Sequence, residues 1–174
     1  VPWPGEVAVF RSPSNEGFEL VAAIGTRART GVLAADLDPG PTSRFDHANA
    51  VLVDLRSGTL ESVTDLALLG GANVFAIESA PGTWEVLQAG TVDLVAPGRY
   101  RLTRLLRGQR GTEHAMGTPT PAGARLVLLG DGLVPLPIGE ADLGVPWTWR
   151  AGPANRAVTD EIYVSQEFTP KGVG

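Results

Sequence analysis

The 174-residue sequence contains no cysteine, two histidines and one methionine. The absence of cysteine excludes disulfides, thiolate nucleophiles and cysteine-ligated zinc. The two histidines, His47 and His114, lie in polar, turn-like surroundings and form no His-x-x-x-His pair. We therefore expect no metal site, no cofactor and no chemistry at either histidine.

Long hydrophobic runs and blocks of one charge are also missing. No apolar stretch approaches the ~20 residues needed to span a bilayer, and no signal sequence begins the chain. Fourteen basic and nineteen acidic residues give a net charge of −5, with neither sign in a long block. The arginines between positions 99 and 110 are a local exception set among apolar residues. We expect neither a membrane span nor a nucleic-acid partner.

The motifs of common enzyme classes are absent too. There is no Gly-x-Ser-x-Gly nucleophile elbow. The glycine-rich stretch from Gly108 to Thr112 has no lysine and no helical pattern after it, so it does not predict a phosphate loop. Asp36 to Gly40 begins like a calcium loop but lacks the later ligands, which indicates a simple turn. We expect the chain not to be an enzyme.

Glycine and proline are abundant instead, at 36 of 174 residues against a usual share of roughly 12%. They separate short stretches in which apolar residues alternate with others, a pattern typical of half-buried strands. The pattern predicts an all-β, barrel- or sandwich-like domain of about ten short strands with at most one or two short helices. The alternating apolar residues are Val7/Val9, Val51/Val53/Leu55, Trp84/Val86, Tyr100/Leu102 and Ile162/Val164.

One short helix is expected over residues 65–69, with Thr64 or Asp65 as its N-cap and Gly70-Gly71 at its exit. The continuous apolar run Leu126–Leu129 indicates a strand buried on both faces.

We expect one domain overall, in three parts. Residues 1–138 would form the main β-barrel-like module, 139–155 an irregular Gly/Pro/Trp-rich connection, and 156–174 a final strand and exit linker. Because the only methionine is Met116 and the chain starts with Val1, either the start was processed or the chain is a segment of a longer polypeptide. The Pro- and Gly-rich ends favour the second interpretation.

Aromatic residues offer one candidate for ligand or partner contact. Trp147 and Trp149 are two residues apart and share a face if the chain is extended. Large aromatics more often cover a core than bind sugar. The candidate contact residues are Trp84, Trp147, Trp149 and Tyr163.

A second candidate is a structural loop after the predicted strand that contains Tyr100 and Leu102. Its expected residues are Arg107, Gly108, Gly111, Thr112 and Glu113. The glycines supply backbone freedom, and the Arg107 guanidinium suits loop carbonyls or a carboxylate such as that of Glu113. We expect Arg107 to be buried in a clasp; the alternative is an exposed contact for another protein.

The segment from Arg99 to Glu113 resembles the Y-x-L-x-x-L-L-R-G-x-x-G-T-E segment of the large tail-tip protein of gene transfer agents and related siphophages. Three other segments agree with that family in the same order, so the resemblance covers most of positions 3–130. These segments are Trp3-Pro4-Gly5 to Arg11-Ser12, Leu69 to Asn73, and Gly123 to Leu129.

The resemblance implies a β-rich module from the C-terminal half of a baseplate hub, or host specificity, protein. Such a virion structural protein would lie at the tail tip of a phage-like particle after synthesis in the bacterial cytoplasm. Its implied partners are other domains and copies of the hub, typically trimeric, and neighbouring tail proteins. The alternative function is a carbohydrate- or receptor-binding module that contacts a host surface glycan. No catalytic residue is carried over, because the shared motif is not catalytic.

Overall fold

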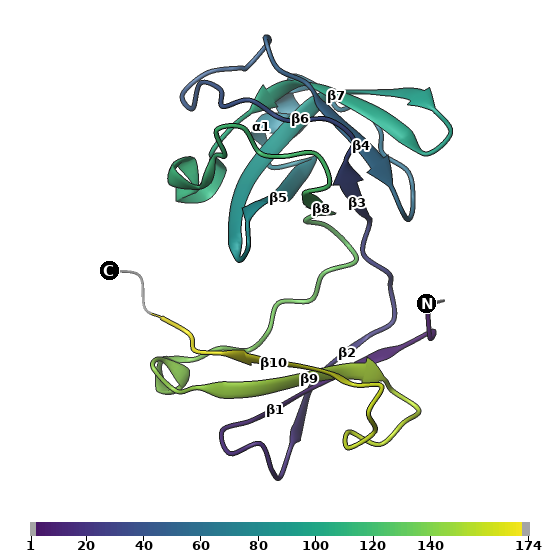
Figure 1. Ribbon diagram of the computed structural model, residues 1–174, viewed down its shortest axis with the longest axis vertical. Coiled ribbons are helices and arrows are strands. Elements are labelled where there is room, and N and C mark those ends of the chain that lie inside the picture. Colours follow the sequence, from purple (N-terminus) through teal and green to yellow (C-terminus); the bar gives the residue numbers. More distant parts are fainter. Residues whose placement is uncertain (1–2, 172–174) are drawn as a thin grey trace. The chain divides into compact units, whose positions relative to one another are not determined.

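The computed structural model describes residues 3–171, which divide into two compact units (Figure 1). One unit spans residues 28–130, and the other combines the chain up to residue 27 with the chain from residue 131. The fold is all-β, as predicted, and the described residues form ten strands and one short α-helix. The expected linker residues 1–2 and 172–174 lie outside the described part.

The unit of residues 28–130 is a closed six-stranded barrel in which all neighbouring strands are antiparallel. The last strand of this unit, β8 (Arg125–Leu128), pairs with both β5 (Val74–Ala80) and β3 (Thr30–Leu33), and this pairing closes the barrel. Closure leaves no strand edge unpaired within the barrel. In spatial order the strands are β3 (Thr30–Leu33), β4 (Val51–Leu55), β7 (Arg99–Leu106), β6 (Thr83–Ala96), β5 (Val74–Ala80) and β8 (Arg125–Leu128).

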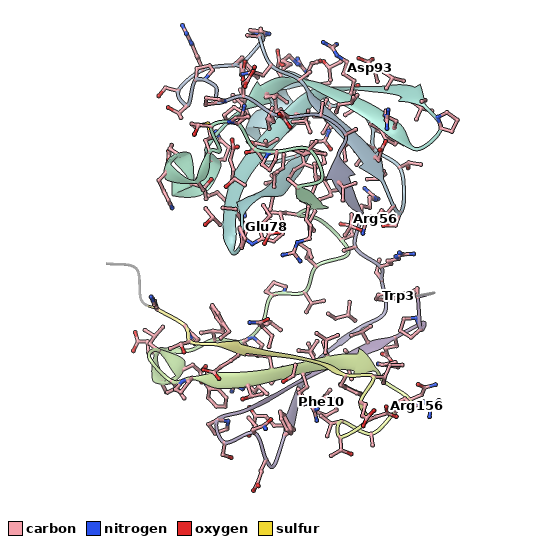
Figure 2. All side chains as sticks on the ribbon, viewed as in Figure 1. Trp3, Phe10, Arg56, Glu78, Asp93 and Arg156 are labelled. Carbon is pink, nitrogen blue, oxygen red and sulfur yellow. The ribbon has the colours of Figure 1, made fainter. Side chains whose placement is uncertain are left out.

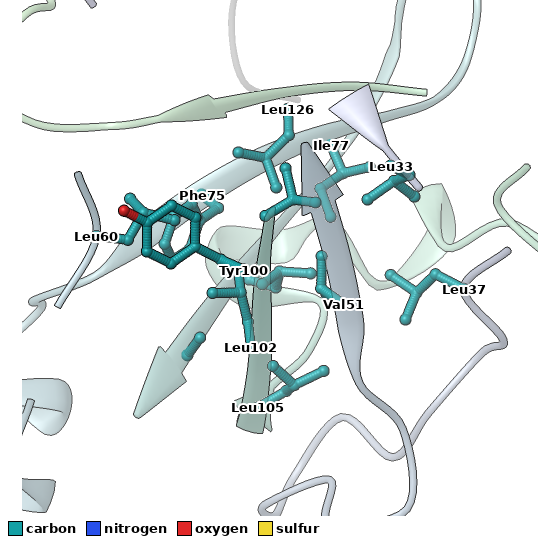
Figure 3. Close-up of a cluster of buried hydrophobic side chains, with 13 residues drawn as sticks. Leu33, Leu37, Val51, Leu60, Phe75, Ile77, Tyr100, Leu102, Leu105 and Leu126 are labelled. Atoms are coloured by element: carbon teal, nitrogen blue, oxygen red, sulfur yellow. The ribbon is translucent and has the colours of Figure 1, made fainter. Parts of the chain in front are cut away.

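A single hydrophobic cluster fills the barrel (Figure 3). Tyr100 and Leu102 are buried in it, as their alternation predicts. At the start of β6, however, Glu85 and Leu87 are buried, while Trp84 and Val86 are only half-buried. Residues at the start of this strand do alternate between two faces, but the face with Glu85 points into the barrel, not the face with Trp84.

The predicted helix is present as α1 (Asp65–Leu69). The Thr64 hydroxyl accepts a hydrogen bond from the backbone N–H of Ala67, which makes Thr64 the N-cap. Gly71, with φ of +94°, supplies the left-handed exit. The Gln88 side chain donates to two carbonyls at the end of the helix, those of Leu68 and Ala72.

The other unit is a four-stranded antiparallel sheet built from both ends of the described chain. Its strands, in spatial order, are β10 (Val164–Phe168), β9 (Trp147–Pro153), β1 (Val7–Ser12) and β2 (Glu19–Ile24).

The sheet differs from the expected division of the chain. β1 and β2 do not belong to the barrel, so residues 1–138 are not one module. Residues 147–153 form strand β9 rather than an irregular connection, because β1 and β10 pair with its two edges. Pairing between segments so far apart in sequence is invisible to local patterns.

Three short 3-10 helices complete the described structure: η1 (Gln109–Gly111), η2 (Glu113–Ala115) and η3 (Glu140–Asp142). Within residues 3–171, no helix is long and apolar enough to cross a membrane.

Candidate functional site

The expected structural loop begins where β7 ends, and its first residue, Arg107, is 0% exposed. The Arg107 side chain therefore lies inside the barrel unit rather than on its surface. Its Nε and Nη2 donate to the two carboxylate oxygens of Glu85 at 2.6 and 2.9 Å. Its Nη1 donates to the carbonyl oxygen of Asp38 at 2.9 Å and to Asp46 Oδ2 at 3.5 Å. We call Arg107, Glu85 and Asp46 the Arg107 cluster.

The carboxylate that pairs with Arg107 is that of Glu85, not that of Glu113 as suggested by the sequence. Glu85 is also fully buried, and one of its oxygens accepts a further hydrogen bond from the backbone N–H of Gly108. This contact between β6 and the loop is a forked pair, the geometry in which a guanidinium binds a carboxylate best. Glu113, in contrast, is exposed.

Asp46 fixes a third segment, the chain between β3 and β4, to the same cluster. Its backbone exchanges two hydrogen bonds with Leu105, and its carboxylate accepts hydrogen bonds from Ala48 and Asn49. Burial alone would raise the pKa of Asp46, but the hydrogen bonds from Asn49 and Ala48 and the charge of Arg107 lower it below its ordinary value. Asp46 is therefore ionised at neutral pH.

The Arg107 cluster combines two carboxylates with one guanidinium, all at most 1% exposed. No substrate can reach these groups without opening the barrel end. Each group instead joins a different segment: the loop after β7, strand β6 and the connection between β3 and β4. The arrangement suits a structural clasp.

The remaining loop residues have separable roles. Gly108 has φ of +58°, and a Cβ there would lie 2.9 Å from Glu113 Cα. Gly111 also has a positive φ, +78°, but a Cβ there would meet nothing within 4 Å. The Thr112 hydroxyl accepts from the backbone N–H of Val86 and donates to the carbonyl of Gln109, so it ties the loop to β6.

The four aromatic candidates do not form one platform. Trp84 belongs to the barrel, and the Arg125 guanidinium lies 5.3 Å from its ring centroid. Trp147 and Trp149 share a face of β9, but Arg11 covers Trp147 at 4.4 Å and Trp149 is only 7% exposed. Tyr163 is buried and donates its hydroxyl to the carbonyl of Pro153.

His47 and His114 are both exposed; His47 lies in the connection between β3 and β4, and His114 lies in η2. Among residues 3–171, no group of three or more His, Asp or Glu side chains could hold a metal ion. At the β5–β6 end of the barrel, where Figure 2 labels Glu78, a hollow of about 520 Å³ is lined by Glu78, Pro81, Pro121 and Arg125, among others. Arg125 and a backbone N–H from Gly82 lower the pKa of Glu78 to about 2.

Sequence reasoning missed Glu85 and Asp46 as partners of Arg107. Asp46 carried a local signal, because an Asp that accepts hydrogen bonds from backbone N–H groups two and three residues later forms a recognisable turn. The sequence around Glu85 contained no such signal, because a glutamate between Trp84 and Val86 is more simply interpreted as part of a solvent-exposed face.

Comparison with known families places the barrel unit. The family model described as Rcc01698-like, C-terminal, matches residues 28–127. This range contains the barrel strands β3 to β7, the first three residues of β8 and the loop from Arg107 to Glu113, and it excludes the four-stranded sheet. The segment from Trp3 to Ser12, included in the resemblance above, lies outside it. No curated protein matches the chain.

Proposed function

Because the chain belongs to the Rcc01698-like C-terminal family, we propose that it is a structural module of a phage-tail-like baseplate hub. In this proposal it is part of the host specificity protein of a gene transfer agent or related siphophage. It acts through contacts with other hub domains, hub copies and neighbouring tail proteins. Its place is the tail tip, after synthesis in the bacterial cytoplasm.

The observation that carries this proposal is the position of the segment that resembles the tail-tip family. The segment from Arg99 to Glu113 supplies strand β7 and the loop that holds Arg107, and it lies inside the matched range. The Arg107 side chain in this loop makes internal contacts, with the Glu85 carboxylate and the carbonyl of Asp38. A charged side chain that stabilises the fold from inside, and is not available to a substrate, supports a structural role for the module.

The proposal includes no catalysis by this module. Glu85 and Asp46 are buried beside one arginine, and Glu78 is held by Arg125 in a two-pronged ion pair. A general acid at neutral pH needs a raised pKa, whereas the pKa values of Glu78 and Asp46 are lowered. These carboxylates are therefore poorly suited to acid catalysis.

The glycan-binding alternative receives no specific support. It requires exposed aromatic faces side by side, as in stacking sites for sugars. Two of its four aromatic residues are buried, and arginines lie over the other two.

The test is to locate the module in particles from a bacterium that encodes the full-length protein. An epitope tag inserted at the exposed turn Pro97-Gly98 should be labelled by antibody-gold at the tail tip, and particles should assemble normally. Label that is absent from tails, with the tagged protein free in the cytoplasm, would contradict the proposal. Release of sugars or peptides from purified cell walls by the isolated chain would contradict its non-catalytic part.

A further inference from the structure

Strand β10 forms one edge of the four-stranded sheet (Figure 1). All five of its residues are exposed. Among the described residues, only β9 pairs with it. Natural sheets usually protect such an edge with a bulge, a proline or several charges. β10 pairs with β9 in unbroken register, contains no proline and carries one charge, that of Glu167.

The opposite edge, β2, is different. The pairing of β2 with β1 shifts register between Val9 and Phe10, which marks an irregularity. Its Glu19 is paired with Arg11. Of the two edges, β10 is therefore the better template for another strand.

An apolar hollow of about 290 Å³ adjoins β10. Gln166 pairs with Trp149, and Phe168 with Trp147, so these four residues share one face of the sheet. Val164 and Phe168 on that face are 71% and 50% exposed. A strand added beside β10 would present every second side chain to this face. The hollow is lined by Val9, Leu136, Trp149, Gln166, Glu167 and Phe168.

Charge distinguishes the possible occupants. Residues 1–27 and 131–174 contain five basic and nine acidic residues, a net charge of −4. Glu167 forms no ion pair within residues 3–171. A second copy would bring two acidic sheets together, whereas a basic segment would complement this one.

We propose that the β10 edge binds an extended, basic polypeptide segment of a partner protein as a fifth strand. Backbone hydrogen bonds to β10 provide affinity, an apolar side chain enters the hollow, and a Lys or Arg faces Glu167. This inference deepens the proposed function and rests on it, because it names one surface through which the module contacts other tail proteins.

The probe is a short fluorescent peptide of alternating Val and Lys, titrated into the full chain and followed by anisotropy. It should bind and slow hydrogen exchange of the backbone amides of residues 164–168. Two controls are a peptide of the same composition with Val and Lys in separate blocks, and an alternating Val and Glu peptide. Each should bind at least about tenfold more weakly, since it lacks the alternation or the charge.

Two matched pairs of variants locate the site. Glu167→Lys should weaken binding about tenfold, while Glu161→Lys, at an exposed position outside the sheet, should change it less than about twofold. Phe168→Lys should abolish binding, while Leu20→Lys, at a similarly exposed apolar residue on the opposite edge, should not. Circular dichroism melts verify that each variant is folded.

Several outcomes would overturn the inference: no binding, equal effects within either pair, or protection of β2 instead of β10. A dimer in sedimentation that is lost in Phe168→Lys would assign the edge to a second copy and also overturn it. The particle-labelling test separates this failure from that of the proposed function. Labelled tail tips without β10 binding refute only the docking edge, whereas β10 binding without labelled tail tips refutes only the tail assignment.

Discussion

At the scale of single residues, Arg107 has the most demanding environment in the barrel. A buried arginine is stable only when its charge and its N–H donors have partners. Glu85 provides two acceptors, and Asp38 and Asp46 provide the others. Loss of Arg107 would leave two carboxylates buried without a countercharge.

We therefore expect Arg107→Ala to lower the free energy of unfolding by about 3–5 kcal/mol, the cost of breaking a buried ion pair from one side. Arg101→Ala, at an exposed position on the preceding strand β7, should change it by no more than about 0.5 kcal/mol. Urea unfolding followed by circular dichroism measures both. Equal stabilities of the two variants would show that the cluster does not stabilise the fold.

Gly108 and Gly111 provide a second comparison at this scale. Both have a positive φ, so alanine at either position is strained, at a cost of about 1 kcal/mol. Only at Gly108 would the new Cβ also collide with backbone, that of Glu113. Gly108→Ala should therefore lower the melting temperature distinctly more than Gly111→Ala. The reverse order in thermal melts would contradict the described path of the loop.

At the scale of elements, the barrel is joined by ion pairs between neighbouring strands as well as by its core. Arg125 of β8 donates to both carboxylate oxygens of Glu78 in β5, at 2.5 and 2.6 Å. This pair lies between two strands that also pair through their backbones. Its Arg125 side chain is 66% exposed to solvent, whereas that of Glu78 is 13% exposed.

The Glu78 pair should make stability depend on pH. The pKa of Glu78 in the folded chain is about 2, below its ordinary value of 4.5. The contribution of the ion pair to folding stability is therefore fully present above pH 4.5 and is lost as the pH falls towards 2. The difference in unfolding free energy between the native chain and Glu78→Gln should therefore shrink over this window. High salt should reduce it at neutral pH. A difference that is constant from pH 6 to pH 2 would contradict the pairing.

At the scale of the whole molecule, the two units are built in different ways. All strand pairs of the barrel, and its hydrophobic cluster, lie within residues 28–130. The four-stranded sheet needs both ends of the described chain, because β1 pairs with β9. The family match ends near the barrel's boundary, at residue 127.

A chain of residues 28–130 should consequently fold alone, since it retains all of its strand pairs and its core. We expect a strand-type circular dichroism spectrum and one cooperative unfolding transition. Residues 131–174 alone should form no stable sheet, because two of the four strands are missing. A 28–130 chain without a cooperative transition would contradict the division into units.

The sequence by itself determined the features that depend on neighbouring residues. The density of glycine and proline predicted an all-β fold, and the residues around 64–71 predicted α1 and its caps. The alternation of Tyr100 and Leu102 identified a core face, and the burial expected for Arg107 agrees with its position. Each depends on backbone preferences or on the two-residue period of a strand, both of which are local.

Only the tertiary structure decided which distant segments pair and which face of an ambiguous strand points inward. β1 and β9 are adjacent although about 140 residues separate them, and no local pattern specifies that partner. Residues 84–87 have apolar side chains on both faces, so alternation could not choose between them. In the folded barrel Glu85 and Leu87 are the inward residues, and Glu85 there pairs with Arg107, which lies in a different segment and whose buried charge needs a countercharge.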